Sequence, residues 1–182
     1  MNLNALAEQL KNGDISLAEW ETRMRDFIRA ESNTAMILTK GGREFITQAD
    51  WGYVGSTVKK QYQFLTGFKN DILSNPLKWS TGRLNNRVRQ YGQIGYSQLE
   101  DFKAREQKKA GFTEERRVLG PVKTEHCESR GDRPGCIELA SKGWQPIGTL
   151  PSIGAAACYQ NCKCKFEYRK PDPENAGGWI GA

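Results

Sequence analysis

The sequence has little of what most enzymes use for catalysis. It contains one histidine in 182 residues, His126, which directly precedes Cys127. It has no glycine-rich phosphate loop and no serine nucleophile elbow, and no pair of carboxylates stands out as an acid–base pair. A His126–Cys127 dyad is disfavoured because neighbours in sequence seldom face each other. We therefore expect a protein that acts by binding and is not an enzyme.

Long apolar segments are also absent. No stretch approaches the roughly 20 apolar residues that span a bilayer. The first residues, MNLNALAEQLKNGD, lack the basic start and apolar run of a secretion signal. We expect a soluble protein that is not secreted and has no membrane partner.

Cysteine is missing from residues 1–109, and this region is dominated by helical periodicity. Apolar residues recur at steps of three and four in two long segments. The first segment contains Leu17, Trp20, Met24, Phe27 and Ile28, and the second contains Trp51, Val54, Val58, Tyr62, Leu65, Phe68 and Ile72. Ser16 with Glu19, and Thr47 with Asp50, have the spacing of capping boxes. Asn75-Pro76 should end the second helix.

A third helix is expected from about Thr81 to Lys109, although Gly92 and Gly95 weaken its middle. This part of the chain is basic, with eight Lys or Arg and three Asp or Glu between Lys78 and Lys109. Such a stretch can meet nucleic acid or an acidic protein surface. The candidate phosphate-binding residues are Arg83, Arg87, Arg89, Lys103 and Arg105. A solvated helix face is the favoured alternative, because aromatic and basic residues do not alternate as a stacking platform requires.

The pattern changes after residue 109. Residues 110–170 are rich in glycine, proline and short β-prone pieces such as RRVLGPV and CKFEYR, and they include all five cysteines. This segment has too few large apolar side chains to build much of a core. We therefore expect it to need a staple, that is, a bound metal ion or disulfide bonds that hold its loops together. The expected fold is mainly α, with long amphipathic helices followed by a small, loop-rich α+β module held by zinc.

Zinc is favoured over a disulfide framework because the number of cysteines is odd and no secretion signal precedes them. Zinc takes four ligands in a tetrahedron. We expect Cys127 and Cys136 to supply one pair and Cys158 and Cys162 the other, with Cys164 as the alternative for one of the latter. His126 is a weaker candidate because adjacent Cys127 would have to share the same metal. Free or disulfide-paired cysteines are the alternative to a metal site.

Residues 116–169 resemble the C-terminal cysteine-containing region of minor head or head-morphogenesis proteins of tailed bacteriophages of the phage Mu type. In that group a first cysteine pair is followed by a Gly-Trp segment, a Leu-Pro turn and a final Asn-Cys-Arg-Cys element. The corresponding positions are Cys127 and Cys136, Gly143-Trp144, Leu150-Pro151, and Asn161-Cys162-Lys163-Cys164. The stretches ISLAEWETRMR and WGYVGSTVKKQYQFL also look similar, so the resemblance extends into the helical part.

This resemblance implies a structural component of the virion, made in the bacterial host cytoplasm and bound to other virion proteins of the portal, capsid or neck. It also implies several copies or a homo-oligomer, and allows the basic helix to contact packaged DNA. Residues 171–182 would form a flexible C-terminal arm, with Trp179 and Ile180 as anchors in a partner's pocket; simple disorder of this tail is the alternative. The competing hypothesis is a zinc-stabilised nucleic-acid-binding protein, whose affinity should fall steeply with salt.

Overall fold

The computed structural model describes residues 1–79, 82–121, 127–159 and 162–170. The chain divides into two compact units, Met1–Leu99 and Glu100–Ala182. The expected fold class is confirmed, because long helices are followed by a small unit of strands and loops that contains a cysteine cluster. Within the described residues, no helix combines the length and apolar character needed to cross a membrane.

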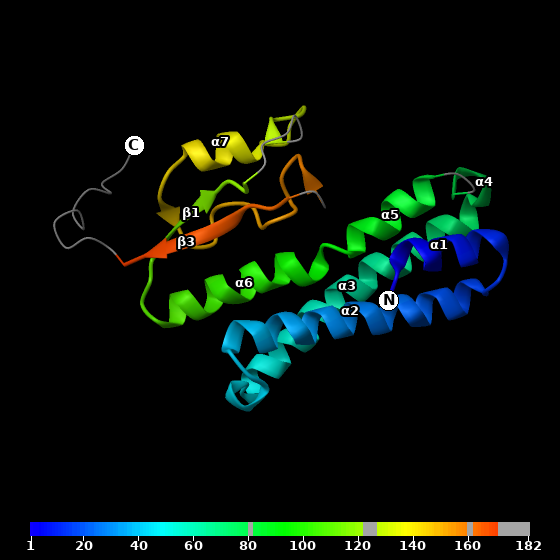
Figure 1. The fold of residues 1–182 in the computed structure, drawn as a ribbon, viewed down its shortest axis with the longest axis horizontal. Helices are drawn as coiled ribbons and strands as arrows, with labels where there is room; N and C mark the ends of the chain where they lie inside the picture. Colours follow the sequence, from blue (N-terminus) through cyan, green and yellow to red (C-terminus); the bar gives the residue numbers. More distant parts are fainter. Residues whose placement is uncertain (80–81, 122–126, 160–161, 171–182) are drawn as a thin grey trace. The chain divides into compact units, whose positions relative to one another are not determined.

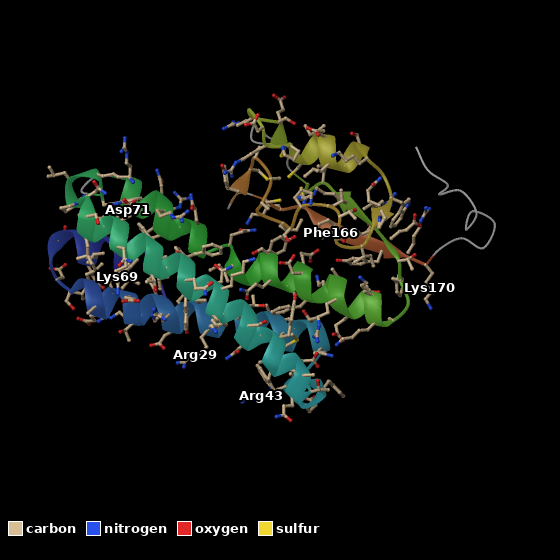
Figure 2. The ribbon with its side chains drawn as sticks, turned by 180° about the vertical axis from the view of Figure 1, so that it is seen from behind. Arg29, Arg43, Lys69, Asp71, Phe166 and Lys170 are labelled. Atoms are coloured by element: carbon tan, nitrogen blue, oxygen red, sulfur yellow. The ribbon has the colours of Figure 1, made fainter. Side chains whose placement is uncertain are left out.

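The first unit is built from helices (Figure 1). They are α1 (Leu3–Asn12), α2 (Leu17–Lys40), the short 3-10 helix η1 (Arg43–Phe45), α3 (Gln48–Ser74), α4 (Pro76–Trp79), α5 (Arg83–Tyr91) and the start of α6 (Ile94–Lys109). The two long helices α2 and α3 pack along each other. Lys69 of α3, labelled in Figure 2, donates to the Glu21 carboxylate of α2 at 2.7 Å, and this ion pair links the two helices.

The helix ends follow from local sequence. The Thr47 hydroxyl accepts from the Asp50 N–H at 3.2 Å, and the Asp50 carboxylate accepts from the Thr47 N–H at 3.1 Å, so this capping box is confirmed. Ser16 forms only half of the expected box: it accepts from the Glu19 N–H, whereas the Glu19 carboxylate pairs with Arg23. Together the two caps fix where α2 and α3 begin.

The two predicted apolar stripes, of α2 and α3, form the core of the first unit together with residues of α1 and α5. Trp20, Met24 and Ile28 of α2 are fully buried, as is Leu65 of α3. The ring of Phe68 is an edge-to-face neighbour of Trp20, with the centroids 5.5 Å apart. Aromatic rings in this geometry add stability beyond the area they bury. Both rings belong to the apolar stripes that the sequence showed at helical spacing.

The helix expected from Thr81 to Lys109 is wrong as a single element. The structure has two helices, α5 and α6, with a break at Gly92 and Gln93. The Gly92 N–H turns back to the Arg89 carbonyl at 3.0 Å, and a Cβ at Gly92 would lie 3.1 Å from that same oxygen. Glycine permits this tight turn, and its conformational freedom disfavours continuing the helix.

The second unit contains the rest of α6, a three-stranded antiparallel sheet and a short helix (Figure 1). The elements are β1 (Glu114–Val118), α7 (Cys136–Ser141), β2 (Gln145–Pro146) and β3 (Lys165–Arg169), and the strand order is β2-β1-β3. The two β-prone pieces noted in the sequence are thus paired strands, with Arg117 opposite Phe166. The unit boundary at Leu99 and Glu100 lies inside α6, whereas sequence analysis divided the chain at residue 109.

Candidate metal centre

Three cysteines of the second unit bring their sulfur atoms together. The Sγ atoms of Cys136, Cys158 and Cys162 all lie within 4.8 Å of one another, and all three residues are buried. The Sγ of Cys136 is 3.1 Å from that of Cys158 and 3.8 Å from that of Cys162. Buried sulfur atoms this close can coordinate one metal ion.

A fourth buried cysteine lies against this group. Cys164 is 3% exposed, and its side chain interacts with those of Cys136 and Cys162. Two backbone amides also donate to sulfur: the Cys164 N–H to Cys162, and the Gly120 N–H to Cys164. Hydrogen bonds of this kind favour the thiolate form, which is the form that binds metal. Cys164 is thus a fourth sulfur beside the group, although it is not one of the three whose Sγ atoms all lie within 4.8 Å of one another.

Close backbone packing holds these cysteines in position. A Cβ added to Gly120, just after β1, would lie 2.8 Å from the Lys163 carbonyl oxygen, between Cys162 and Cys164. A larger residue than glycine would push this turn away from the end of β1. The chain between Cys162 and Cys164 is therefore fixed to the sheet by contact with its own backbone.

The start of α7 is fixed in a similar way. A Cβ on Gly135 would clash with the backbone of Cys127 and Glu128, so the loop before α7 folds tightly over this glycine. The Gly135 N–H donates to the Ser129 hydroxyl at 2.8 Å, and that hydroxyl donates to the Glu138 carboxylate at 2.6 Å. These contacts place Cys136 at the first position of α7, fully buried.

Contacts among the thiols separate their pKa values. Hydrogen bonds with Cys136, Cys158 and Cys164, in that order, hold the pKa of Cys162 far below its ordinary value. Contacts with Cys158 and Cys162 raise the pKa of Cys136, and contacts with Cys136 and Cys162 raise that of Cys164. The contact of Cys158 with Cys136 lowers its pKa, but its contact with Cys162 and burial outweigh this and raise it to about 11. A metal ion bound here would displace the protons of the thiols that it coordinates.

The structure places the remaining predicted ligands differently. Cys127 is half-buried and is not among the three sulfurs that lie within 4.8 Å of one another. Sequence analysis paired it with Cys136, but Cys136 instead meets Cys158 and Cys162. His126, and the anchor candidates Trp179 and Ile180, lie outside the described residues.

The basic candidates are divided between the two units. Arg83 and Arg89 of α5 are exposed, and the half-buried Arg87 donates to the Gln90 side chain and lies 5.7 Å from the Phe68 ring centroid. In the second unit Lys103 pairs with Glu100 at 2.8 Å, and Arg105 lies 3.7 Å from Glu106. Acidic neighbours compete with phosphate for the last two, so no observation here favours a nucleic-acid site.

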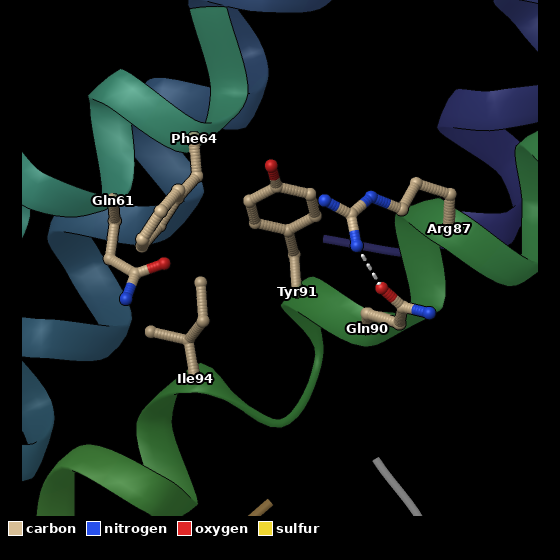
Figure 3. A pocket seen from close by; sticks show the side chains of 6 residues that line it. All are labelled: Gln61, Phe64, Arg87, Gln90, Tyr91 and Ile94. Atoms are coloured by element: carbon tan, nitrogen blue, oxygen red, sulfur yellow. Dashed lines mark hydrogen bonds between the residues drawn. The ribbon is translucent and has the colours of Figure 1, made fainter. Parts of the chain in front are cut away.

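A small pocket lies in the first unit between α3 and α5 (Figure 3). It has a volume of about 150 Å³ and is lined by Gln61, Phe64, Arg87, Gln90, Tyr91 and Ile94. In Figure 3 the Arg87 guanidinium is hydrogen-bonded to Gln90 and lies beside the Tyr91 ring. The pocket has room for one side chain of a partner. It contains no nucleophile or metal-ligand set.

One residue at the centre was not found by sequence reasoning. Arg117 of β1 is 2% exposed, and its guanidinium reaches the cluster, 3.7 Å from the Cys136 Sγ and 3.9 Å from the Cys162 Sγ. One feature of the sequence indicated that Arg117 is buried: it lies in a short β-prone segment, two residues after Glu115. Residues two apart in a strand lie on the same face. Adjacent Arg116 has the same residue type and points outward, so composition could not separate the two.

Comparisons with known proteins do not assign the chain to a family. No protein-family model, no curated protein and no solved structure matches it. The geometry of the cysteine cluster and the sequence pattern that includes it remain as the indications of function.

Proposed function

We propose that the second unit is a structural zinc module with Cys136, Cys158, Cys162 and Cys164 as its ligands. One observation carries the proposal: three buried sulfurs lie within 4.8 Å of one another, with Cys164 in contact with two of them. Zinc is the metal best suited to an all-thiolate tetrahedron of this kind. A site with four protein ligands is closed to substrate, which favours a structural role over a catalytic one.

We further propose that the chain acts by binding other proteins, as a minor head, portal or neck component of a tailed-phage virion. The support is the resemblance carried by the cysteine-containing region, residues 116–169, together with a helical unit whose surface exposes large apolar side chains. Phe64 and Leu73 of α3 are 51% and 64% exposed, and Leu38 of α2 is 64% exposed. Exposed apolar groups of this size are suited to contacts between protein chains.

Metal content of the purified chain and of five single Cys→Ser variants tests the zinc module. Elemental and native mass spectrometry should find about one zinc in the wild type, and loss of zinc in the variants at 136, 158, 162 and 164. Cys127→Ser is the matched control and should keep its zinc. A wild type without metal and with two disulfides would refute the module. Loss of zinc in Cys127→Ser but not in Cys164→Ser would show a different ligand set.

Particle association tests the assembly role separately. An antibody against this chain should label heads or necks of purified tailed particles from the strain that encodes it. The chain should also stay with the particles through a high-salt wash, because its proposed contacts are with protein. Its recovery only in the particle-free fraction would contradict the virion role and leave the zinc result unaffected.

A further inference from the structure

The second unit buries a cation with unusual surroundings. In β1 the side chains alternate, so Glu115 and Arg117 face inward, at 2% exposure each, while Arg116 faces outward and pairs with Glu167. A guanidinium removed from water needs an anion or a full set of acceptors to offset the lost solvation. The groups that contact Arg117 therefore indicate which negative charge its guanidinium offsets.

The Arg117 guanidinium lies next to two sulfur atoms of the cysteine cluster. One terminal nitrogen of Arg117 lies 3.7 Å from the Cys136 Sγ and 3.9 Å from the Cys162 Sγ, and the other donates to the Pro151 carbonyl. The Phe166 ring centroid lies 5.1 Å from the centre of the guanidinium. The Nε is buried and lacks a hydrogen-bond partner among the described residues. Arg117 thus joins the sulfur cluster to the turn at Pro151.

Arg117 attracts the Glu115 carboxylate electrostatically, but no carboxylate forms an ion pair with its guanidinium in the part of the chain that the structure describes. Glu115 is the acidic neighbour on the same face of β1, but one of its oxygens accepts from the amides of Gly148 at 3.0 Å and Leu150 at 3.3 Å. No ion pair joins it to Arg117 among those residues. Besides the neutral Pro151 carbonyl and the Phe166 ring, the groups that the Arg117 guanidinium approaches are the sulfurs of Cys136 and Cys162.

We propose that Arg117 is a charge-compensating and positioning residue of the zinc centre, an inference that depends on the zinc module proposed above. Four thiolates around Zn²⁺ carry a net charge of −2, which is unfavourable in a buried site. The guanidinium offsets part of this charge, donates to the Cys136 and Cys162 sulfurs, and holds the loop at Pro151 against them. Partners outside the coordination shell typically change metal affinity by roughly 10–100-fold.

Zinc affinity of three variants, measured by competition with a chromogenic chelator on the full chain, tests the inference. Arg117→Met keeps much of the side-chain volume and removes the charge and both donors, and it should weaken zinc binding by about 10–100-fold while keeping one zinc per chain. Arg117→Lys restores the charge without the fork of donors and should recover part of the loss. Arg116→Met, on the outward face of the same strand, is the matched control and should bind zinc like the wild type.

Cobalt(II) substitution separates the electronic effect from a merely structural one. Hydrogen bonds lower the energy of sulfur lone pairs, so Arg117→Met should shift the sulfur-to-cobalt charge-transfer bands to longer wavelength while the bands of tetrahedral cobalt stay unchanged. Unchanged zinc affinity and charge-transfer bands in Arg117→Met would overturn this inference alone. A wild type that binds neither zinc nor cobalt would overturn the zinc module as well.

Discussion

The two units of this chain reach stability by different routes. The helical unit buries a continuous set of large apolar side chains, including Trp20, Met24 and Leu65, and its helices are capped by local hydrogen bonds. The second unit buries fewer large apolar groups, and cysteines and ionisable residues such as Glu100, Glu115 and Arg117 make up much of its interior. A core held by apolar packing keeps its stability when a bound metal ion is removed. In a polar interior every buried polar group needs a partner, so the loss of one contact destabilises the whole unit.

The polar contacts of the second unit tie helix and strands together. Glu100 of α6 is 1% exposed and accepts from the Phe166 N–H of β3 at 2.9 Å. Glu115 of β1 accepts from the loop after β2. These carboxylates satisfy backbone amides that would otherwise be buried without a partner. The comparison therefore predicts that the two units respond to different perturbations.

Metal removal should produce the largest difference between the units. Binding of a structural zinc contributes about 10–16 kcal/mol at neutral pH in small modules, and this energy is available only to the folded state. After chelation we expect loss of hydrogen-exchange protection in β1 and β3, with protection in α2 and α3 unchanged. Exchange measured by mass spectrometry, with and without chelator, checks this. Equal loss in both units would show that they do not differ in the way described.

Truncation of a core side chain in the helical unit should destabilise that unit and leave the second unit folded. Trp20→Ala removes a fully buried ring that contacts Phe68, and a change of this kind costs about 3–5 kcal/mol. We expect the helical unit to unfold at a lower urea concentration while the chain still holds one zinc. Far-ultraviolet circular dichroism and native mass spectrometry measure the two properties. Loss of zinc in this variant would contradict separate stabilisation.

The same substitution at two glycines should have effects of opposite sign. Gly135→Ala forces a methyl group into the backbone of Cys127 and Glu128, and should destabilise the second unit by about 1–3 kcal/mol and weaken zinc binding. Gly52→Ala, at an exposed position of α3 with open space around it, should stabilise the helical unit by about 0.5–1 kcal/mol. Urea titrations of both variants decide this. Tolerance of alanine at 135 would mean that the loop can move.

Local signals were enough to predict most of the helical unit. The Thr47–Asp50 box, the stop at Asn75-Pro76 and the apolar stripes all depend on residues within a few positions of one another, and each is present as expected. The break at Gly92 was underestimated, because the free energy of continuing a helix through glycine is small and tertiary contacts decide the outcome. The apolar stripe that the sequence showed for the first helix was followed only to Ile28, whereas α2 continues to Lys40.

The cysteine unit was predictable only in outline. Its dense cysteines and sparse apolar residues indicated a staple, and three buried sulfurs do meet. The expected partnership of Cys127 with Cys136 came from their order in the chain, but order does not fix distance across a loop. The position of Cys136 depends on the tight loop at Gly135, and the burial of Arg117 depends on the register of β1 with β3.

The sequence by itself determined the two long helices, the Thr47–Asp50 capping box and the apolar stripes, because these depend on interactions between neighbours along the chain. Only the tertiary structure decided which sulfurs meet and that Arg117 lies among them. The physical reason is that Arg117, Cys136 and Cys162 come from β1, α7 and the segment before β3, and they are brought together by strand pairing and close backbone contact. Such contacts between distant residues depend on geometry that no local pattern specifies.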